Sequence, residues 1–391
     1  MVSVYDKVEE CSGCGSCYMT CGYHAIEMVN DEDGFLYPKI NRDKCKDCDS
    51  CKNACPVIQR KSVEDRESEK IAYAARTSNK DILRNSTSGG MSFELGKEII
   101  QRGGVVFGAC YVNGLKVEHQ IIENLNELYR MQGSKYVQSN IGNTYRLCKE
   151  VLKVGRPVLF TGTPCQIEGL LVYLKRDYEN LYTQDLICHG VPSPGLWSKY
   201  IMENKFRKSA DNIVFRDKSI GWETGARFLI ENAGKKRYEP LHKNAFYKLF
   251  DRNFLLRPIC YECPFKSKNK RSDITCADLW GISTILPQYS NDDRGMSLIL
   301  VNSQKGKALL SAVKARCEIY NISYDKAIIH NMMALKSVTC PPTRTQFFLD
   351  AKHMNYKKLA KKYIPRDSVI LSLKKKLYPV KIWFVEYLLK K

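Results

Sequence analysis

Two runs of cysteine offer the clearest chemistry in this sequence. The first run reads CSGCGSCYMTC and the second reads CKDCDSCKNAC, so both follow the spacing C-x2-C-x2-C-x3-C. Three thiolates two residues apart can wrap one iron–sulfur cubane from a tight loop, while the fourth points away toward a second cubane. We therefore assign the eight cysteines to two 4Fe-4S clusters. One cluster is held by Cys11, Cys14, Cys17 and Cys55, and the other by Cys45, Cys48, Cys51 and Cys21.

The same spacing is the pattern of bacterial ferredoxins. Pro56 follows the last cysteine, as that pattern expects, whereas Gly22 stands where a proline would follow Cys21. The alternative is a pair of zinc sites, but zinc favours two CxxC knuckles for each ion. Two neighbouring clusters predict an α+β ferredoxin-like head, residues 1–60, that conducts electrons.

The composition of the chain indicates the cellular environment in which this head works. The chain has 391 residues, seventeen cysteines and a net charge of +20. Its first residues lack the apolar stretch of a secretory signal, so we expect a cytoplasmic, reducing environment in which clustered cysteines bind metal. No apolar run approaches the roughly 20 residues that span a bilayer. No nucleic-acid motif accompanies the positive charge, so nucleic acid is not a predicted partner.

The positive charge is unevenly distributed along the chain. Residues 1–60 carry ten acids against seven Lys and Arg residues, whereas the rest of the chain carries 32 acids against 55. Residues 349–391 form a basic amphipathic C-terminal segment. Such a segment can lie on an anionic membrane surface, which would make the protein membrane-peripheral. The alternative is a helix docked on the body with solvated lysines.

Beyond a charged linker at 61–70, strand-like and helix-like stretches alternate along the chain. We predict strands at 105–112, 157–160, 181–187, 213–215 and 297–302, and helices at 91–102, 141–153, 165–175 and from 303 to about 316. This alternation is typical of an α/β domain, which we place at residues 71–348.

The body carries a second set of cysteines at the ends of predicted elements. Cys165 lies between a strand and a helix, Cys188 follows a strand, and Cys260 and Cys263 form a CxxC. Together these four could hold a third cluster. Separately, Cys165 could be a nucleophile, and the CxxC could be half of a zinc knuckle. Cys276 is the rival for a ligand position.

A second candidate site precedes the helix predicted at 91–102. The loop STSGG, residues 86–90, offers small and hydroxyl residues whose N–H groups could bind a phosphate at the helix start. An ordinary helix cap explains the same residues.

Several long motifs resemble the family of the beta subunit of coenzyme F(420) hydrogenase/dehydrogenase. They are STSGGMSFEL, GSKYVQS, VLFTGTPCQIEGL, DLICHGVPSPGLW, FRDKSIGW, LRPICYECPFK and DITCADLWGI. The resemblance runs from about Ile71 to about Ser303 and extends to the head, because many members carry one. Members are iron–sulfur flavoproteins that bind FAD, and relatives act on the deazaflavin coenzyme F(420) or, in plants, on a chlorophyll derivative.

The resemblance implies roles for particular residues. It implies an α/β flavin-binding domain, with a third 4Fe-4S cluster at Cys165, Cys188, Cys260 and Cys263, and it demotes Cys276. The candidate cofactor contacts that we infer are Thr87, Ser88, Gly89, Gly90, Lys135 and Gly162. Lys135 would contact flavin or an anionic substrate, unless it is a surface lysine. His189 would move a proton, or it would hydrogen-bond a cluster sulfur.

These features predict an iron–sulfur flavoprotein oxidoreductase. Electrons would pass between the head clusters, FAD and a reducible small molecule, with a redox partner protein such as ferredoxin on the other side. The substrate would be coenzyme F(420) or, because bacterial relatives occur near polysaccharide-synthesis enzymes, a sugar precursor. The alternative is a non-catalytic electron-transfer subunit of a larger redox complex.

Overall fold

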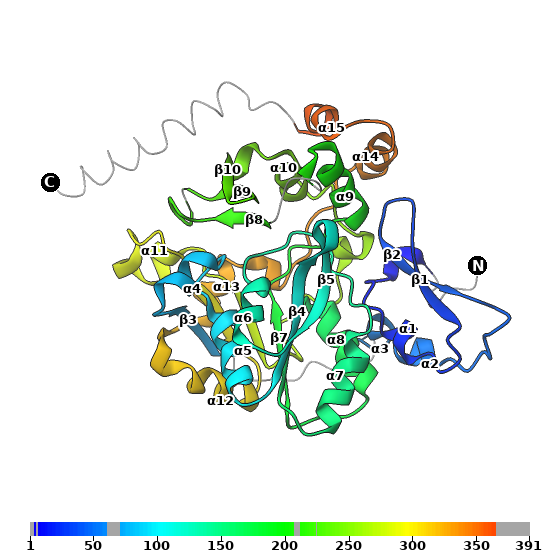
Figure 1. Ribbon diagram of the computed structural model, residues 1–391, viewed down its shortest axis with the longest axis horizontal. Helices are drawn as coiled ribbons and strands as arrows, with labels where there is room; N and C mark the ends of the chain where they lie inside the picture. Colours follow the sequence, from blue (N-terminus) through cyan, green and yellow to red (C-terminus); the bar gives the residue numbers. More distant parts are fainter. Residues whose placement is uncertain (1–3, 5–6, 61–70, 207–211, 224, 365–391) are drawn as a thin grey trace. The chain divides into compact units, whose positions relative to one another are not determined.

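The computed structural model describes residue 4 and residues 7–60, 71–206, 212–223 and 225–364 (Figure 1). The predicted linker at 61–70, and the predicted basic segment from residue 365 onward, lie outside the described residues. The chain divides into two compact units, Met1–Pro341 and Pro342–Lys391. Every helix in the described part of the chain is too short or too polar to cross a membrane.

The head of the first unit consists of a hairpin and two cysteine loops. Strands β1 (Ile26–Asn30) and β2 (Leu36–Ile40) pair in antiparallel fashion. The first loop leads into α1 (Ser16–Thr20), and the second leads through α2 (Ser50–Asn53) into α3 (Pro56–Arg60). The two loops have equivalent backbones, because Gly13 and Gly15 of the first and Asp47 and Asp49 of the second all have positive φ. Glycine and aspartate tolerate that conformation better than most residues.

The body is built on a mixed eight-stranded sheet in the order β13-β3-β12-β11-β7-β6-β4-β5. The four strands from β11 to β4 run parallel to one another, and the strands outside them pair antiparallel. Their bounds are β3 (Ile71–Thr77), β4 (Val105–Val112), β5 (Lys116–Ile122), β6 (Val158–Thr161), β7 (Leu181–Leu186), β11 (Ile274–Asp278), β12 (Ser297–Val301) and β13 (Cys317–Ile322). The predicted α/β character of the body is therefore confirmed.

Helices cover both faces of this sheet (Figure 1). Alternating residues of β4 show the division, because Val106 belongs to the core under α5 whereas Val105 and Phe107 belong to the core under α7 and α8. The body helices are α4 (Lys80–Asn85), α5 (Met91–Gln101), α6 (Leu125–Leu128), α7 (Thr144–Lys153), α8 (Pro164–Leu174), α9 (Pro194–Glu203), α10 (Ala245–Asp251), α11 (Ile282–Ile285), α12 (Gln304–Ala312) and α13 (Tyr324–Ile329).

A smaller antiparallel sheet completes the first unit. It contains β8 (Asn212–Asp217), β9 (Arg227–Asn232) and β10 (Lys235–Pro240). Its inner face packs on α9 and α10 through aromatic rings, because the ring centroid of Phe215 lies 5.3 Å from that of Trp197 and 5.9 Å from that of Phe246. This aromatic core fixes β8, which carries the arginine described below.

The second unit is described only through its two helices, α14 (Arg344–Ala351) and α15 (Tyr356–Tyr363). Asp350 joins them by pairing with Lys362 and accepting a 2.7 Å hydrogen bond from the Tyr363 hydroxyl. The body boundary that we predict at residue 348 falls inside α14.

Candidate functional site

The cysteines that the spacing assigns to the first head cluster act on one another's pKa. Burial raises the pKa of Cys14 to about 12, and the charges of Cys55 and Cys11 add to the rise. Burial likewise raises the pKa of Cys17, together with the charges of Cys14, Cys11 and Cys55. Thiolates buried so close together need a cation, and iron supplies one. The cysteines that the spacing assigns to one cluster therefore lie together.

The second head group lies nearer to solvent. The pKa of Cys51 is raised by burial and then by the charges of Cys21 and Cys45. Cys48 is exposed, and its sulfur lies 3.3 Å from the Ser50 hydroxyl.

No three His, Cys, Asp or Glu side chains of the described residues stand close enough together to hold a single metal ion. A cubane binds each cysteine through a different iron, so its four ligands stand further apart than the ligands of one ion. Each group is therefore recognised by the electrostatic interactions among its thiolates, and not by side chains that point at one ion.

The four body cysteines also form a group. Burial raises the pKa of Cys165, and the charges of the other three cysteines raise it further. Burial places the pKa of Cys188 at about 11 and that of Cys260 at about 12. Cys276 is apart from this group, because it is buried in the core under α5 and none of the four acts on its pKa.

Local sequence explains how these cysteines meet. Thr163 caps α8 reciprocally with Gln166, and Pro164 opens the helix, so Cys165 is fixed in its first turn. β6 and β7 are parallel, so the residues that follow them reach the same edge of the sheet. Cys188 follows β7 at this edge, and the short helix Pro258–Glu262 brings Cys260 and Cys263 to it.

The body cysteines surround a small cavity that reaches the head. All four line it, and so does Ser12, which lies between two head cysteines in the sequence. On α8, a Cβ added at Gly169 would lie 3.1 Å from the sulfur of Cys14. The first head group therefore packs directly on the helix that presents Cys165.

A large cavity of about 690 Å³ lies at the carboxyl edge of the parallel strands, where α/β folds bind ligands. Cys188, Gly190, Val191 and Met333 line both this cavity and the small one. The head, the four-cysteine group and the large cavity thus form a continuous series.

Five of the six predicted cofactor residues line the large cavity, namely Thr87, Ser88, Gly90, Lys135 and Gly162. Gly89 does not line it. Its N–H donates to the Ser297 hydroxyl at 3.0 Å, and an added Cβ would lie 2.3 Å from the carbonyl oxygen of Ala75. Gly89 is therefore needed for packing against β3 and β12.

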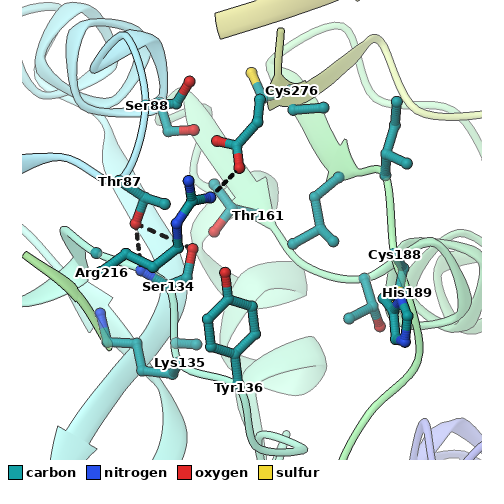
Figure 2. A pocket seen from close by; sticks show the side chains of 18 of the residues that line it. Thr87, Ser88, Ser134, Lys135, Tyr136, Thr161, Cys188, His189, Arg216 and Cys276 are labelled. Carbon is teal, nitrogen blue, oxygen red and sulfur yellow. Dashed lines mark hydrogen bonds and ion pairs between the residues drawn. The ribbon is translucent and has the colours of Figure 1, made fainter. Parts of the chain in front are cut away.

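The loop at 86–90 is braced from the neighbouring segment. The Thr87 hydroxyl accepts a 2.7 Å hydrogen bond from the N–H of Ser134, and the two hydroxyls are 3.0 Å apart (Figure 2). Gly90 provides no side-chain cap for α5. The first-turn N–H groups of α5, at Met91 and Ser92 in the cavity wall, are therefore left to another acceptor.

Lys135 faces away from the cysteine side of the cavity (Figure 2). Its ammonium donates to the carbonyl oxygens of Arg130 at 3.0 Å and Gln132 at 2.9 Å. Burial lowers its pKa to about 8. In this structure the lysine braces its own loop, although its side chain is part of the cavity wall.

His189 stands at the opposite end of the cavity, beside Cys188 (Figure 2). Its Nε2 is 2.7 Å from the Asn253 side-chain oxygen. With that oxygen as acceptor, Nε2 carries the hydrogen and Nδ1 is free of one. Burial lowers the pKa of the imidazole, although the hydrogen bond to Asn253 opposes the change.

Sequence reasoning missed an ion pair in the middle of the cavity. Arg216 of β8 (Figure 2) pairs with Asp278 at the end of β11. Its guanidinium lies 5.3 Å from the Trp222 ring and 5.2 Å from the Trp280 ring. The motifs FRDKSIGW and DITCADLWGI contain these residues, but their spacing gives no sign that they meet.

Two further groups in the cavity wall carry polar atoms inward. The side-chain oxygen of Gln184 is buried without a hydrogen-bond partner among the described residues, while its amide donates to the Ser92 hydroxyl at 2.8 Å. His119 is fixed between the Ser139 hydroxyl at 2.6 Å and the Thr161 carbonyl at 2.9 Å. The unpaired oxygen of Gln184 can accept a hydrogen bond.

The chain is similar to several known proteins. A 4Fe-4S dicluster domain matches residues 10–58, and the family described as the C terminus of the coenzyme F(420) hydrogenase/dehydrogenase beta subunit matches residues 155–325. Pyruvate synthase subunit PorD of Methanocaldococcus jannaschii is 45% identical over 49 residues, which are 12% of this chain. The chain spans about half, 52%, of the length of this curated relative.

A solved structure is also similar. It is a chain of the F(420)-reducing NiFe hydrogenase complex from Methanosarcina barkeri, in a xenon derivative, with 16% sequence identity and a TM-score of 0.46. The similarity covers 69% of this chain and 93% of that chain.

The matched head makes this chain an iron–sulfur protein with a 4Fe-4S dicluster domain, as the cysteine spacing predicts. The match over residues 155–325 confirms the resemblance of its motifs to the coenzyme F(420) hydrogenase/dehydrogenase beta subunit family. The stretch matched to the family contains all four body cysteines, whereas the loop at 86–90 and Lys135 precede it.

Proposed function

We propose that this chain is an iron–sulfur flavoprotein oxidoreductase that exchanges electrons between its dicluster head and a reducible small molecule. One observation carries the proposal. The cavity of about 690 Å³ shares its wall with the four-cysteine cavity, and that second cavity is lined by Ser12 of the head. A chain that only carried electrons would have no use for a ligand cavity at the end of the series.

We assign a third 4Fe-4S cluster to Cys165, Cys188, Cys260 and Cys263. Their thiols are buried and act on one another's pKa, which is costly without a metal. Lys266 and Lys270 line the same cavity and would offset the negative charge of a cluster held by four thiolates.

We assign FAD to the large cavity. The uncapped first turn of α5 would receive its phosphates, since backbone N–H groups at a helix start bind anions. Gln184 would accept a hydrogen bond from the cofactor. The clusters exchange single electrons, and the flavin converts them into two-electron chemistry.

His189 and the Arg216–Asp278 pair would serve the substrate in this cavity. Nδ1 of His189 can accept a proton, because Nε2 is held by Asn253. Arg216 is 6% exposed and already paired, so it would orient an anionic group of the substrate through a shared interaction with Asp278.

The redox partner would meet the head at Cys45–Cys51. This is the more exposed cysteine group, whereas Cys14 packs against α8 of the body and Cys17 is buried. PorD, which matches only the head region, is by name a subunit of pyruvate synthase, and this favours a head that receives electrons from another protein. We propose a cytoplasmic location for the exchange.

Iron, sulfide and flavin analysis of anaerobically purified protein tests the proposal. We expect about twelve iron atoms per chain, from three cubanes, and one flavin. Full iron without flavin would favour the alternative, an electron-transfer subunit of a larger complex. Reoxidation of the reduced flavin by coenzyme F(420) would then identify the substrate, and its failure would point to another reducible molecule, such as a sugar precursor.

A further inference from the structure

Arg257 is a fully buried guanidinium between the head and the body. It is 0% exposed and lies just before the helix that carries Cys260. Its Nε donates to the carbonyl oxygen of Cys11 at 2.6 Å. Its Nη atoms donate to the side-chain oxygen of Gln138 and the carbonyl oxygen of Leu36, both at 3.0 Å. The ring of Tyr37 lies 4.0 Å from the guanidinium carbon.

All these partners are neutral. No carboxylate of the described residues pairs with Arg257. A guanidinium stays protonated, so its positive charge is buried without an opposite charge on a conventional side chain. Such a charge strongly destabilises the fold unless it is compensated. The structure must therefore supply negative charge close by.

The available negative charge belongs to cysteine thiolates. Burial lowers the pKa of Arg257, but Cys11, then Tyr37 and Cys260, raise it more. Cys11 belongs to the first head group and Cys260 to the body group. Gly13 connects Arg257 to the Cys11 thiolate. Its N–H donates to the Cys11 sulfur at 3.3 Å, and a Cβ added at Gly13 would lie 2.8 Å from an Nη atom of Arg257.

We propose that Arg257 is the counter-charge of the iron–sulfur centre held by Cys11, Cys14, Cys17 and Cys55, and that it raises the reduction potential of this centre above that of the exposed one. Four thiolates give an oxidised cubane a net charge of −2, and adding one electron makes it −3. A fixed positive charge stabilises the second state more than the first. Arg257 thereby draws electrons from the surface of the head toward the body. This electrostatic role of Arg257 rests on the electron path proposed above.

The test is an anaerobic redox titration of the full chain followed by electron paramagnetic resonance, with iron analysis of each sample. Three variants are compared with the unchanged protein. Arg257→Gln removes the charge, Arg257→Lys keeps it, and Arg252→Gln removes a charge from an exposed arginine five residues earlier. Iron content is measured first, because it separates loss of a cluster from a change in its potential.

We expect Arg257→Gln to keep its iron and to shift one head signal to lower potential. Arg257→Lys should shift it less, and Arg252→Gln should leave it unchanged. Full iron with unchanged potentials in Arg257→Gln would overturn the proposal. If Arg257→Gln loses iron while Arg257→Lys retains it, the result supports a role for the positive charge. If both variants lose iron, the result overturns the proposal and shows that the shape of the arginine side chain is what matters. Absence of flavin or of a third cluster in the unchanged protein would contradict the proposed function. The reduction potentials of the two head clusters would still decide the role of Arg257.

Discussion

Arg60 ends the last helix of the head and binds three parts of the body. Its Nη1 pairs with Glu168 of α8 at 2.5 Å, its Nε donates to the carbonyl oxygen of Pro264 at 2.8 Å, and its Nη2 donates to that of Asn269 at 3.3 Å. The Arg60 side chain is 14% exposed and the Glu168 side chain 8%. The pair therefore fixes the head to the helix of Cys165 and to the loop that follows Cys263.

Replacing Arg60 by alanine should destabilise the chain by about 3 kcal/mol. Removing one partner of a buried ion pair costs about 3–5 kcal/mol, because the other charge is left buried. The lower end applies, since Arg271 remains 3.1 Å from the second oxygen of Glu168. The matched control is Arg271→Ala. The Arg271 side chain is 43% exposed, so its loss should cost less than about 1 kcal/mol.

The assay is anaerobic urea unfolding, followed by circular dichroism and by the visible absorbance of the clusters. A double-mutant cycle with Glu168→Gln isolates the pair, and we expect a coupling of about 1–3 kcal/mol. Equal destabilisation by Arg60→Ala and Arg271→Ala, or additive effects of Arg60→Ala and Glu168→Gln, would refute the claim that this pair fixes the head to the body.

Three further predictions concern the cavities. Cys165→Ser should lower the iron content from about twelve to about eight atoms per chain, whereas Cys276→Ser should leave it unchanged; equal iron in both would remove the third cluster. Gln184→Leu should weaken flavin binding about tenfold through the loss of one buried hydrogen bond, and an unaltered dissociation constant in a fluorescence titration would exclude Gln184 as a contact. Burial lowers the pKa of His119 to about 4, so as the pH falls the imidazole is protonated in the unfolded chain before it is protonated in the folded chain. The free energy of unfolding is therefore unaffected by His119 above about pH 6.5 and decreases by about 3 kcal/mol as the pH falls to 4. His119→Asn should flatten this dependence, and an identical pH profile of the unfolding midpoint would contradict it.

Strands with strong local patterns were predictable from the sequence. The run VVFGACYV is β4, Val105–Val112, and the segments predicted at 157–160 and 181–187 are β6 and β7 within a residue. The edge strands β5 and β13 were missed because their mixed polar composition reflects partial burial. The inner strands β3 and β11 were missed because their alanines and aspartate are weak strand formers. Local sequence therefore identified three of the four parallel strands, β4, β6 and β7.

The site was predictable only where the functional residues lie close together in the sequence. The cysteine runs define the head because their ligands lie within a few residues of one another. The arginines could not be found in this way. Arg257 is 246 positions from Cys11, and Arg60 is 108 positions from Glu168, so only folding brings each pair together. Neither the residue types nor the hydrophobic periodicity of the sequence predicts such long-range contacts.

The most direct test of the electron path is the anaerobic reduction of the bound flavin by a reduced ferredoxin, compared between the unchanged chain and Cys14→Ser. Cys14 packs against α8 and interacts electrostatically with Cys55 and Cys11 of the first head group. The flavin absorbance should bleach rapidly in the unchanged chain and slowly in the variant, while dithionite should bleach both. Equal bleaching by ferredoxin in the two proteins would mean that electrons reach the cavity without passing through the head.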